Sequence, residues 1–298
     1  MLALLKHHMP VGVRNAARSV ARYAERVLLW PVILWQVRGE TLADKLVLVR
    51  SALAAPFLAL RSLHQWQDPI LLRDARVNVP GVGRFHLRAH TDDLWHVVPW
   101  RERSIIALMG EVLGPGDTFI DAGANIGVYT VLAARLVGPH GRVLSVEMMP
   151  DTAERLALHI RLNHLPNVTV VRSALNDSAG EMVTATVQKG KHGQATIAAD
   201  FDRYGLGTPV QVLTTTLDSI TRHLGDVRLM KIDVEGAELR ALRGARSLLQ
   251  RLGGVVYEAR GWKQNVFDPV GHLLHAYGFA LRELDGNNRM AERASGSG

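Results

Sequence analysis

Cysteine is absent from the 298 residues of the chain. This absence excludes a disulfide scaffold, a thiolate nucleophile, and zinc or iron–sulfur sites with cysteine ligands. It also fits a reducing compartment, so we expect a cytoplasmic protein. Apolar residues make up 47% of the chain and charged residues 21%, a mixture that excludes a disordered chain and is typical of a globular protein with a sizeable core.

Long apolar runs are also missing. The run from Val27 to Trp35 covers nine residues and contains Pro31, and the stretch between Lys45 and Arg61 is interrupted by a charge and a proline. A spanning helix needs about 20 apolar residues. The first charges are also placed wrongly for a cleaved signal peptide, whose basic residues precede its apolar core. The sequence therefore predicts neither a membrane span nor a cleaved leader.

Positive charge is concentrated near the N-terminus. The net charge is +7, and residues 1–61 hold nine Lys and Arg against three acids, which leaves +1 for the remaining 237 residues. A nearly neutral body argues against a protein that holds nucleic acid along a basic face. We therefore expect no nucleic-acid partner.

The basic N-terminal region has the spacing of an amphipathic helix. Four arginines recur at every fourth position, so that a helix would place them along one stripe: Arg14, Arg18, Arg22 and Arg26. Trp30 and Trp35 lie just beyond them in the sequence. A basic stripe beside apolar residues and tryptophan is typical of a helix that lies on an anionic membrane, here at its inner face. The alternative is a helical cap packed on the rest of the protein, with a solvated arginine face.

The remainder of the chain predicts an α/β fold. Residues 76–90 alternate around a Pro-Gly-Val-Gly turn, which predicts a β-hairpin. From Gly116 onward strands alternate with helices, as in a mostly parallel sheet with helices on both faces. The expected strands are 118–121, 142–147, 168–172, 229–233 and 255–258, and the expected helices are 126–137, 151–163 and one that ends near 249. The predicted parts are a helical region at 1–75, a domain at 76–290 with its motif core at 100–258, and a disordered tail at 291–298.

A turn rich in glycine joins the first strand to its helix and contains Asp121, Gly123, Asn125 and Gly127. Glycine lets the backbone approach a ligand closely and adopt positive φ. The Gly-x-Gly-x-x-Gly spacing that seats a pyrophosphate is missing, and a carboxylate suits a cationic ligand. We therefore predict that this turn binds a cofactor that carries positive charge. The alternative is a turn that only packs the helix on the sheet.

The next two strand ends also carry candidate binding residues. Glu147 ends the second strand, where an acid in a nucleotide-binding sheet accepts hydrogen bonds from both ribose hydroxyls. Ser173 and Ala174 follow the third strand, where small side chains would hold an adenine. Ordinary turn chemistry explains the third position equally well.

The most distinctive segment is Lys231-Ile-Asp-Val-Glu-Gly-Ala-Glu238. Its acids lie at a strand end and in the first helical turn, where carboxylates also cap free N–H groups. Capping does not explain Asp233, which lies at the edge where ligands of open α/β sheets bind, and Glu258 ends the next strand in the same way. We expect Asp233, Glu235 or Glu258 to orient or deprotonate a hydroxyl. The same acids also suit a hard cation, and no metal site is assigned.

A further catalytic candidate is His192, which lies between Gly190 and Gly193. The glycines predict a loop over residues 189–204 that acts as a lid over the substrate. The alternative is a solvated basic loop.

Together these motifs resemble those of the FkbM-type S-adenosylmethionine-dependent methyltransferases. The resemblance covers about residues 100–258 and rests on positions 116–117, 121–130, 147, 163–177 and 231–238. It implies a Rossmann-like class I methyltransferase sheet of seven strands, S-adenosylmethionine as cofactor, and methyl transfer to a hydroxyl of a sugar, glycolipid or related natural product. The cofactor-binding residues that it implies are Glu102, Asp121, Gly123, Asn125, Gly127, Tyr129, Glu147, Met148, Ser173, Ala174 and Asp233. One departure is that two methionines separate Glu147 from Pro150, where the family usually has proline directly after the acid.

Three other functions share parts of this pattern. A nicotinamide-dependent oxidoreductase would share Glu147 but needs the missing phosphate-binding glycine spacing. An RNA methyltransferase would share the cofactor half but needs basic and aromatic residues around its pocket. A non-catalytic, membrane-associated nucleotide-binding protein would keep the pocket without the chemistry.

Overall fold

The computed structural model describes residues 11–60, 68–198, 207–259 and 268–293. The chain forms two compact units, one from residues 1–80 and 85–98, and the other from residues 81–84 and 99–298. The domain boundary predicted at residue 75 lies at the start of β2 (Ala75–Val79), a few residues before the first segment of the first unit ends.

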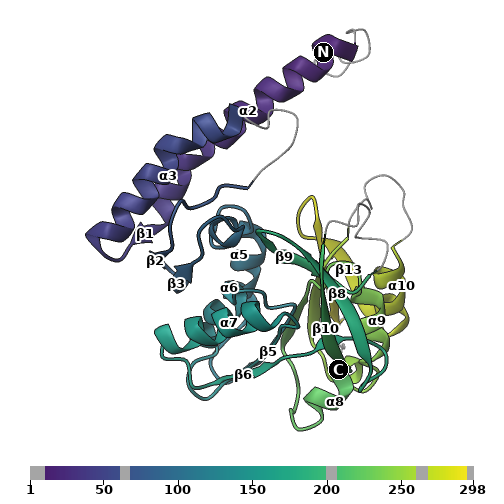
Figure 1. Cartoon of the computed structure of the whole chain (residues 1–298). Helices are drawn as coiled ribbons and strands as arrows, with labels where there is room; N and C mark the ends of the chain where they lie inside the picture. The colour runs from purple at the N-terminus through teal and green to yellow at the C-terminus, as the bar shows by residue number, and fades with distance from the viewer. Residues whose placement is uncertain (1–10, 61–67, 199–206, 260–267, 294–298) are drawn as a thin grey trace. The chain divides into compact units, whose positions relative to one another are not determined.

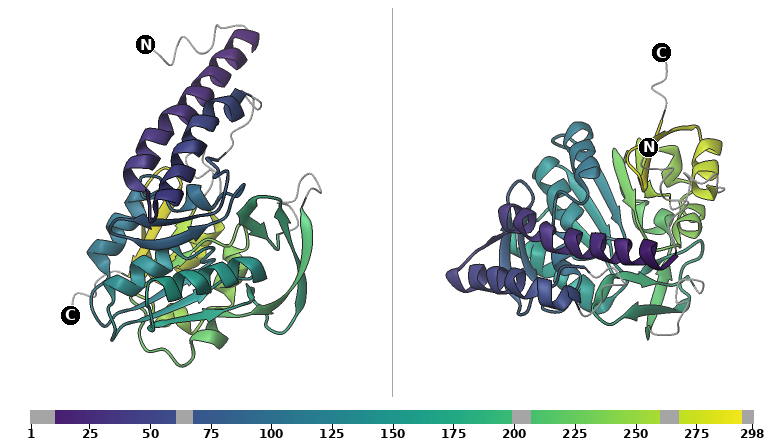
Figure 2. Two further views of the ribbon diagram at one scale, coloured as in Figure 1. Left: turned by 60° about the vertical axis from the view of Figure 1, so that its left-hand side comes forward. Right: turned by 90° about the horizontal axis from the view of Figure 1, so that it is seen from above.

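In its described residues, the first unit contains two long helices, one short helix and a small sheet (Figure 1). α2 (Val11–Gln36) leads through the short strand β1 (Arg38–Gly39) into α3 (Leu42–Leu60), and the two helices lie side by side in Figures 1 and 2. The sheet has the order β1-β2-β3, with β3 at Gly83–Leu87, and α4 (Asp93–His96) follows. β2 and β3 are neighbours in this sheet and a three-residue turn joins them, so the predicted hairpin is confirmed. Their apolar residues are buried.

The contact between α2 and α3 buries one side of α2. Trp30 is buried, and Arg26 is only 9% exposed, with its Nη1 3.4 Å from the backbone oxygen of Ala59 on α3. The predicted basic stripe is therefore wrong at Arg26, because this side chain turns toward α3 and not toward solvent. The side chains of residues 11–18, which include two of the four arginines, lie outside the described part of the chain.

A seven-stranded sheet forms the centre of the second unit. Its strand order is β13-β14-β12-β11-β4-β5-β6, and all neighbouring pairs are parallel except the two that involve β14. The strands are β4 (Thr118–Ala122), β5 (Arg142–Val146), β6 (Val168–Val171), β11 (Leu229–Ile232), β12 (Gly254–Glu258), β13 (Phe279–Glu283) and β14 (Asn288–Arg293). The α/β class and the seven strands that the resemblance implies are confirmed.

Helices cover both faces of this sheet. On one face, strand residues such as Ile120 and Met230 pack with apolar residues of α8 (Leu217–Thr221), α9 (Glu238–Arg243), the 3₁₀ turn η2 (Leu248–Gln250) and α10 (Pro269–Ala276). Alternate strand residues, such as Phe119, point to the opposite face, where α6 (Val128–Leu136) contacts β4 and β5. α5 (Arg103–Val112) precedes β4, and α7 (Pro150–Leu162) joins β5 to β6.

The helix predicted to run from the fourth strand to about residue 249 is interrupted. α9 ends before Gly244, whose position leaves no room for a side chain, because a Cβ there would lie 2.4 Å from the backbone oxygen of Asn176. The chain then begins the short turn η2, where the Asp218 carboxylate accepts hydrogen bonds from the backbone N–H groups of Ser247 and Leu248. Close packing and a side-chain cap therefore replace one long helix with two short ones.

A second, smaller sheet was not expected from the sequence. Its order is β7-β10-β8-β9, with β7 at Ala174–Leu175, β8 at Met182–Gln188, β9 at Lys191–Thr196 and β10 at Thr208–Thr215. The predicted loop over residues 189–204 is therefore wrong for residues 191–196, which form β9. Residues 199–206 lie outside the described part of the chain.

Two further predictions meet the structure near the chain ends. β14 extends to Arg293, so the tail predicted at 291–298 begins three residues too early, and residues 294–298 lie outside the described residues. Within the part of the chain that the structure describes, no helix is both long enough and apolar enough to cross a membrane.

Candidate active site

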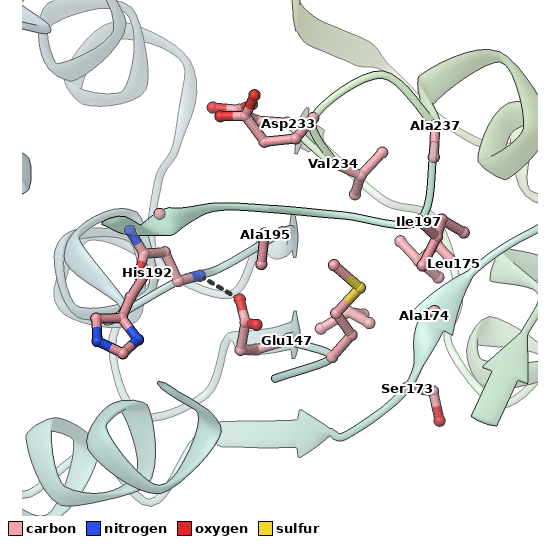
Figure 3. A pocket seen from close by; sticks show the side chains of 16 residues that line it. Glu147, Ser173, Ala174, Leu175, His192, Ala195, Ile197, Asp233, Val234 and Ala237 are labelled. Atoms are coloured by element: carbon pink, nitrogen blue, oxygen red, sulfur yellow. Dashed lines mark hydrogen bonds between the residues drawn. The ribbon is translucent and has the colours of Figure 1, made fainter. Parts of the chain in front are cut away.

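A pocket lies at the carboxyl ends of the central strands, with β9 and β7 of the second sheet forming part of its wall (Figure 3). The carboxyl ends of parallel strands meet at one edge of a sheet, so residues far apart in sequence converge there. The lining residues are Gly123, Asn125, Val146, Glu147, Met148, Ser173, Ala174, Leu175, His192, Gly193, Ala195, Ile197, Asp233, Val234, Glu235 and Ala237.

The turn between β4 and α6 supplies one wall. Gly123 has φ +87°, and a Cβ on it would lie 1.9 Å from the backbone oxygen of Asp233, so only glycine allows these two segments to meet. Gly127 has φ +88°, and a Cβ there would lie 2.3 Å from Leu156 Cδ1, so this glycine packs against α7. Asn125 also has positive φ, at +49°, and its buried Oδ1 has no hydrogen-bond partner. The turn therefore presents an unsatisfied amide oxygen beside the pocket.

The carboxylate of Glu147 lies in this pocket just after β5 and is 8% exposed. Its Oε2 accepts a hydrogen bond from the backbone N–H of Asn125 at 2.9 Å, and its Oε1 accepts one from Met149 at 2.8 Å. Burial raises the pKa of Glu147 to about 7, although these two hydrogen bonds oppose the shift. Figure 3 shows its side chain directed into the pocket. The position predicted for a ribose-binding acid therefore holds a buried, oriented carboxyl group.

A buried ammonium lies behind Asp233. Lys231 is 5% exposed, and its Nζ lies 3.0 Å from Asp233 Oδ2 and 4.8 Å from the centre of the Tyr129 ring. The Tyr129 hydroxyl donates a hydrogen bond to Glu102. Burial lowers the pKa of Lys231, but the carboxylates of Asp233, Glu102 and Asp121 outweigh burial and raise it overall. Lys231 therefore stays charged and links Asp233 to the start of α5.

Asp121 lies on the same face of the sheet, opposite Lys231 in the β4–β11 register. It is fully buried, and its Oδ2 accepts a hydrogen bond from Thr130 Oγ1 at 2.6 Å, while its Oδ1 has no hydrogen-bond partner. Burial raises the pKa of Asp121, and Lys231 partly offsets this effect. Asp121 is therefore part of the buried charge cluster behind the pocket, and it is not among the lining residues.

The segment after β11 forms a tight loop around the pocket. Glu235 has φ +50° and its backbone oxygen accepts a hydrogen bond from Thr196 Oγ1 on β9 at 2.7 Å. The carboxylate of Glu238, the first residue of α9, accepts hydrogen bonds from the N–H groups of Val234 and Gly236. These donors lie in the loop before the helix and no side chain caps the start of α9, so Glu238 closes the loop and the predicted capping of the helix is wrong. Two of the four non-glycine residues with positive φ in the described chain, Asn125 and Glu235, line this pocket. Such strained conformations are concentrated at functional sites.

The structure brings together most of the predicted site residues. Those that line the pocket are Gly123, Asn125, Glu147, Met148, Ser173, Ala174, His192, Asp233 and Glu235, and those that do not are Glu102, Asp121, Gly127, Tyr129 and Glu258. Glu258 ends β12, beside β11 as predicted, but it pairs with Asn288 of β14 and lies outside the pocket lining. The roles assigned to all these residues stay predictions.

The sequence did not predict the wall formed by β9 and the residue that follows it. His192 was expected on a loop but lies on β9, and Ala195 and Ile197 line the pocket beside it (Figure 3). The alternation of Val183, Ala185 and Val187 on β8 is the period-two signal that predicts a strand here.

Comparison with known proteins shows the family of this chain. The model of the FkbM methyltransferase domain matches residues 121–281, more than half of the chain, and the chain belongs to this family. It is 23% identical to the hexuronic acid methyltransferase AglP of Haloferax volcanii over 211 residues, 67% of this chain and 82% of that protein. It is 28% identical to the methyltransferase sdnD of Sordaria araneosa over 44% of this chain and 61% of that protein.

Two of the solved structures that match this chain are similar to it over about two thirds of its length. A methyltransferase FkbM from Methylobacillus flagellatus KT matches with a TM-score of 0.39 and 20% identity over 67% of this chain and 54% of that chain. Fibrillarin from Aeropyrum pernix, solved with bound S-adenosyl-L-methionine, matches with a TM-score of 0.40 and 16% identity over 63% of this chain and 73% of that chain. The family match makes the protein an S-adenosylmethionine-dependent methyltransferase, and its own seven-stranded sheet is Rossmann-like.

The pocket fits this cofactor chemically. Three carboxylates line it, from Glu147, Asp233 and Glu235, while none of the lining residues that the structure describes is Lys or Arg. This composition suits a ligand that carries an ammonium and a sulfonium, and it disfavours a pyrophosphate. The unpartnered Oδ1 of Asn125 offers a further acceptor. Glu147, Asn125 and Asp233 are therefore the residues expected to hold the cofactor.

Proposed function

We propose that this methyltransferase transfers the methyl group to a hydroxyl oxygen of a sugar, glycolipid or related natural product. The single observation that supports this proposal most is the placement of Asp233 and Glu235 in the same pocket as Glu147. A hydroxyl acceptor next to the cofactor would therefore have a carboxylate beside it. His192 on β9 adds a second type of proton acceptor at the same pocket.

The proposed reaction needs little from the protein beyond alignment and removal of one proton. S-adenosylmethionine supplies a methyl group on a positively charged sulfur, which is a good leaving group. The acceptor oxygen would form a bond to the methyl carbon as the carbon–sulfur bond breaks, S-adenosylhomocysteine would leave, and the hydroxyl proton would pass to a carboxylate of this chain. Asp233, held by Lys231, is the best placed acceptor for that proton, with Glu235 and His192 as the other candidates. Glu258 stays a weaker candidate because it lies outside the lining.

The sugar part of the proposal is supported by one relative. The Haloferax volcanii protein is named as a hexuronic acid methyltransferase, and its match covers 82% of its own length. From this relative, which is 23% identical, we infer the class of acceptor, a sugar, and not the particular sugar.

The test is transfer of labelled methyl groups from S-adenosylmethionine to a panel of acceptors: a hexuronic acid, a neutral hexose, a glycolipid fraction and RNA. We expect a sugar or glycolipid product whose added methyl group survives mild alkali, because an ether is stable and a methyl ester is not. Methyl groups that alkali releases, or labelling of RNA alone, would overturn the proposal.

A matched pair of variants tests the carboxylate. Asp233→Asn should lower turnover by at least tenfold while the free energy of unfolding changes little. Asp226→Asn, which replaces an exposed acid just before β11, serves as the control. Retained turnover in Asp233→Asn together with a collapse of stability would assign this residue a structural role only.

We propose in addition that the acceptor lies near a membrane, with residues 1–61 docking on an anionic surface at the inner, cytoplasmic face. The support is the uneven charge, with +6 in those 61 residues and +1 in the rest. Each basic residue close to an anionic surface contributes on the order of 1 kcal/mol.

A further inference from the structure

α3 carries apolar residues around its whole circumference, interrupted by three charged residues, but among the described residues protein covers only one side of it. Leu48, Ser51 and Ala59 are buried, and Ser51 Oγ accepts a hydrogen bond from the backbone N–H of Leu72 at 3.0 Å. A helix that is apolar all round is normally buried in protein or in lipid. The opposite side of α3 has no such cover among the described residues, and its side chains are exposed.

The exposed side forms a continuous line that we call the outer stripe. Its six residues are 44% to 74% exposed and are Leu42, Leu46, Val49, Leu53, Phe57 and Leu60. Their spacing of three and four residues places them within an arc of about 80° along roughly 27 Å of helix. α2 adds Val20, Leu28 and Trp35, along with Leu34, whereas the only exposed large apolar side chains in the rest of the described chain are Trp100, Met182 and Leu213. Exposed apolar surface is therefore concentrated on this helix pair, as at an interaction site.

Positive charge borders the outer stripe on both edges. Lys45 and Arg50 are exposed and fall on opposite sides of the stripe at 100° per residue. Asp44, the acid of α3, is turned away: its carboxylate accepts hydrogen bonds from Thr41 and from the backbone N–H of Arg76 on β2. The outer side of α3 therefore combines apolar residues at its centre with basic residues at its edges.

We infer that the outer stripe of α3 inserts into the boundary between headgroups and acyl chains of an anionic membrane, with Lys45 and Arg50 at the level of the lipid phosphates. This inference rests on the proposed docking and identifies the face that does it, on α3 and not on the arginine side of α2. The charge favours lipid over a second copy of the chain, because pairing two such faces would bring together two regions of net charge +6. A helix with an apolar stripe and basic edges lies in the plane of the interface, with its apolar side toward the acyl chains.

The experiment is co-sedimentation of the full-length protein with vesicles of phosphatidylglycerol and phosphatidylcholine, and with vesicles of phosphatidylcholine alone, at low and high salt. The test variant is Leu53→Glu/Phe57→Glu on the outer stripe. The matched control is Met182→Glu/Leu213→Glu, which changes two exposed apolar residues of the second unit. We expect the wild type and the control to bind the anionic vesicles equally, and the test variant to bind at least tenfold more weakly.

A second variant, Lys45→Gln/Arg50→Gln, should lose most of the salt-sensitive part of binding and keep the part that high salt does not remove. Sedimentation velocity of the proteins without vesicles tests whether a second copy of the chain covers the outer stripe instead of lipid. A dimer in the wild type that Leu53→Glu/Phe57→Glu converts to a monomer would assign the stripe to a second copy and overturn the inference. So would equal vesicle binding by the test variant and the wild type.

Calorimetry with S-adenosylmethionine separates this inference from the methyltransferase assignment. All these variants should bind the cofactor as the wild type does, since the changed residues lie outside the pocket lining. A variant that no longer binds vesicles but still binds the cofactor would show that the outer stripe acts in membrane binding and not in the methyltransferase site.

Discussion

The ammonium of Lys231 lies 3.0 Å from Oδ2 of Asp233, two residues further along the same chain, on the strand and just past its end. Lys231 is 5% exposed, whereas the side chain of Asp233 is 36% exposed and reaches the pocket. Lys231 is thus buried in the protein, and Asp233 faces the pocket. Such an arrangement fixes the orientation of a carboxylate while leaving it accessible.

Replacement of Lys231 tests this relationship. Lys231→Met leaves the fully buried Asp121 without its ammonium neighbour, and removal of one partner from a buried charge cluster costs about 3 kcal/mol or more. Burial already raises the pKa of Asp121, and loss of Lys231 raises it further. In the folded variant Asp121 then keeps its proton at a pH where Asp121 of the unfolded chain, with its ordinary pKa, has released it. The free energy of unfolding therefore falls as the pH rises. We expect a larger loss in urea unfolding at pH 8 than at pH 5.

Lys231→Arg is the control, because it keeps the charge and should recover part of the stability. Turnover should fall in Lys231→Met by more than cofactor affinity falls, since Asp233 loses the group that orients it. Equal stability of Lys231→Met and the wild type at pH 8 would contradict the role of this ammonium.

The buried carboxyl group of Glu147 is expected to lower the free energy of unfolding at neutral pH. Its pKa is raised by burial to about 7, whereas the unfolded chain has the ordinary value near 4.5. The folded protein therefore binds the extra proton between these values, and its stability falls as the pH rises from 4.5 to 7. The shift corresponds to at most about 3 kcal/mol at pH 8. The stability of Glu147→Gln should stay constant over this range, because an amide does not titrate, so the difference between the two proteins should move in favour of the variant by about 2 kcal/mol between pH 5 and pH 8.

The same variant should bind S-adenosylmethionine at least tenfold more weakly, because hydrogen bonds to a charged acceptor are worth about 1.5–3 kcal/mol. Wild-type affinity should rise between pH 6 and 8 as the carboxylate forms, and the affinity of Glu147→Gln should stay flat. Calorimetry in two buffers with different ionisation enthalpies measures the linked proton. Wild-type affinity that is independent of pH would remove Glu147 from the binding site.

Gly123 is expected to be irreplaceable for a steric reason. In Gly123→Ala the new Cβ would meet the backbone oxygen of Asp233 at 1.9 Å, so the end of β11 must move, and positive φ adds about 1–2 kcal/mol. Gly138→Ala is a matched control, because Gly138 also has positive φ but a Cβ on it would meet no heavy atom within 4 Å. Thermal unfolding should show a loss for Gly123→Ala at least twice that of the control. Similar losses would show that only backbone conformation matters at Gly123.

The central sheet and half of the pocket were predictable because their signals are local. Apolar runs that end in Asp121, Glu147 and Asp233 mark strand ends, and parallel strands place those ends together. The structure confirms that Glu147 and Asp233 line one pocket, but it places Asp121 behind it. Side-chain direction at a strand end depends on the register of neighbouring strands, which the sequence of one strand does not contain.

The sequence did not predict the second sheet, because the glycines in and beside β9 are typical of a loop. β9 begins next to Gly190 and contains Gly193, and β8 has polar residues on its outer side. The pairing of β10 with β8, for example Val210 with Ala185, joins segments that are distant in the chain. The Tyr129–Glu102 contact is similar, since 27 residues separate the partners and only the packing of α5 brings them together.

Asn125 offers the sharpest test of whether the β4–α6 turn serves the ligand or only the fold. Its φ of +49° lies in the left-handed region that favours glycine and that asparagine adopts at a smaller cost than most residues, and its buried Oδ1 has no hydrogen-bond partner. Asn125→Gly removes both costs, so the ligand-free protein should be about 1 kcal/mol more stable. The backbone N–H that donates to Glu147 Oε2 is kept in this variant. Any loss of cofactor affinity must therefore come from the amide side chain, and we expect at least a fivefold loss by calorimetry. Unchanged affinity with raised stability would assign Asn125 to the turn alone.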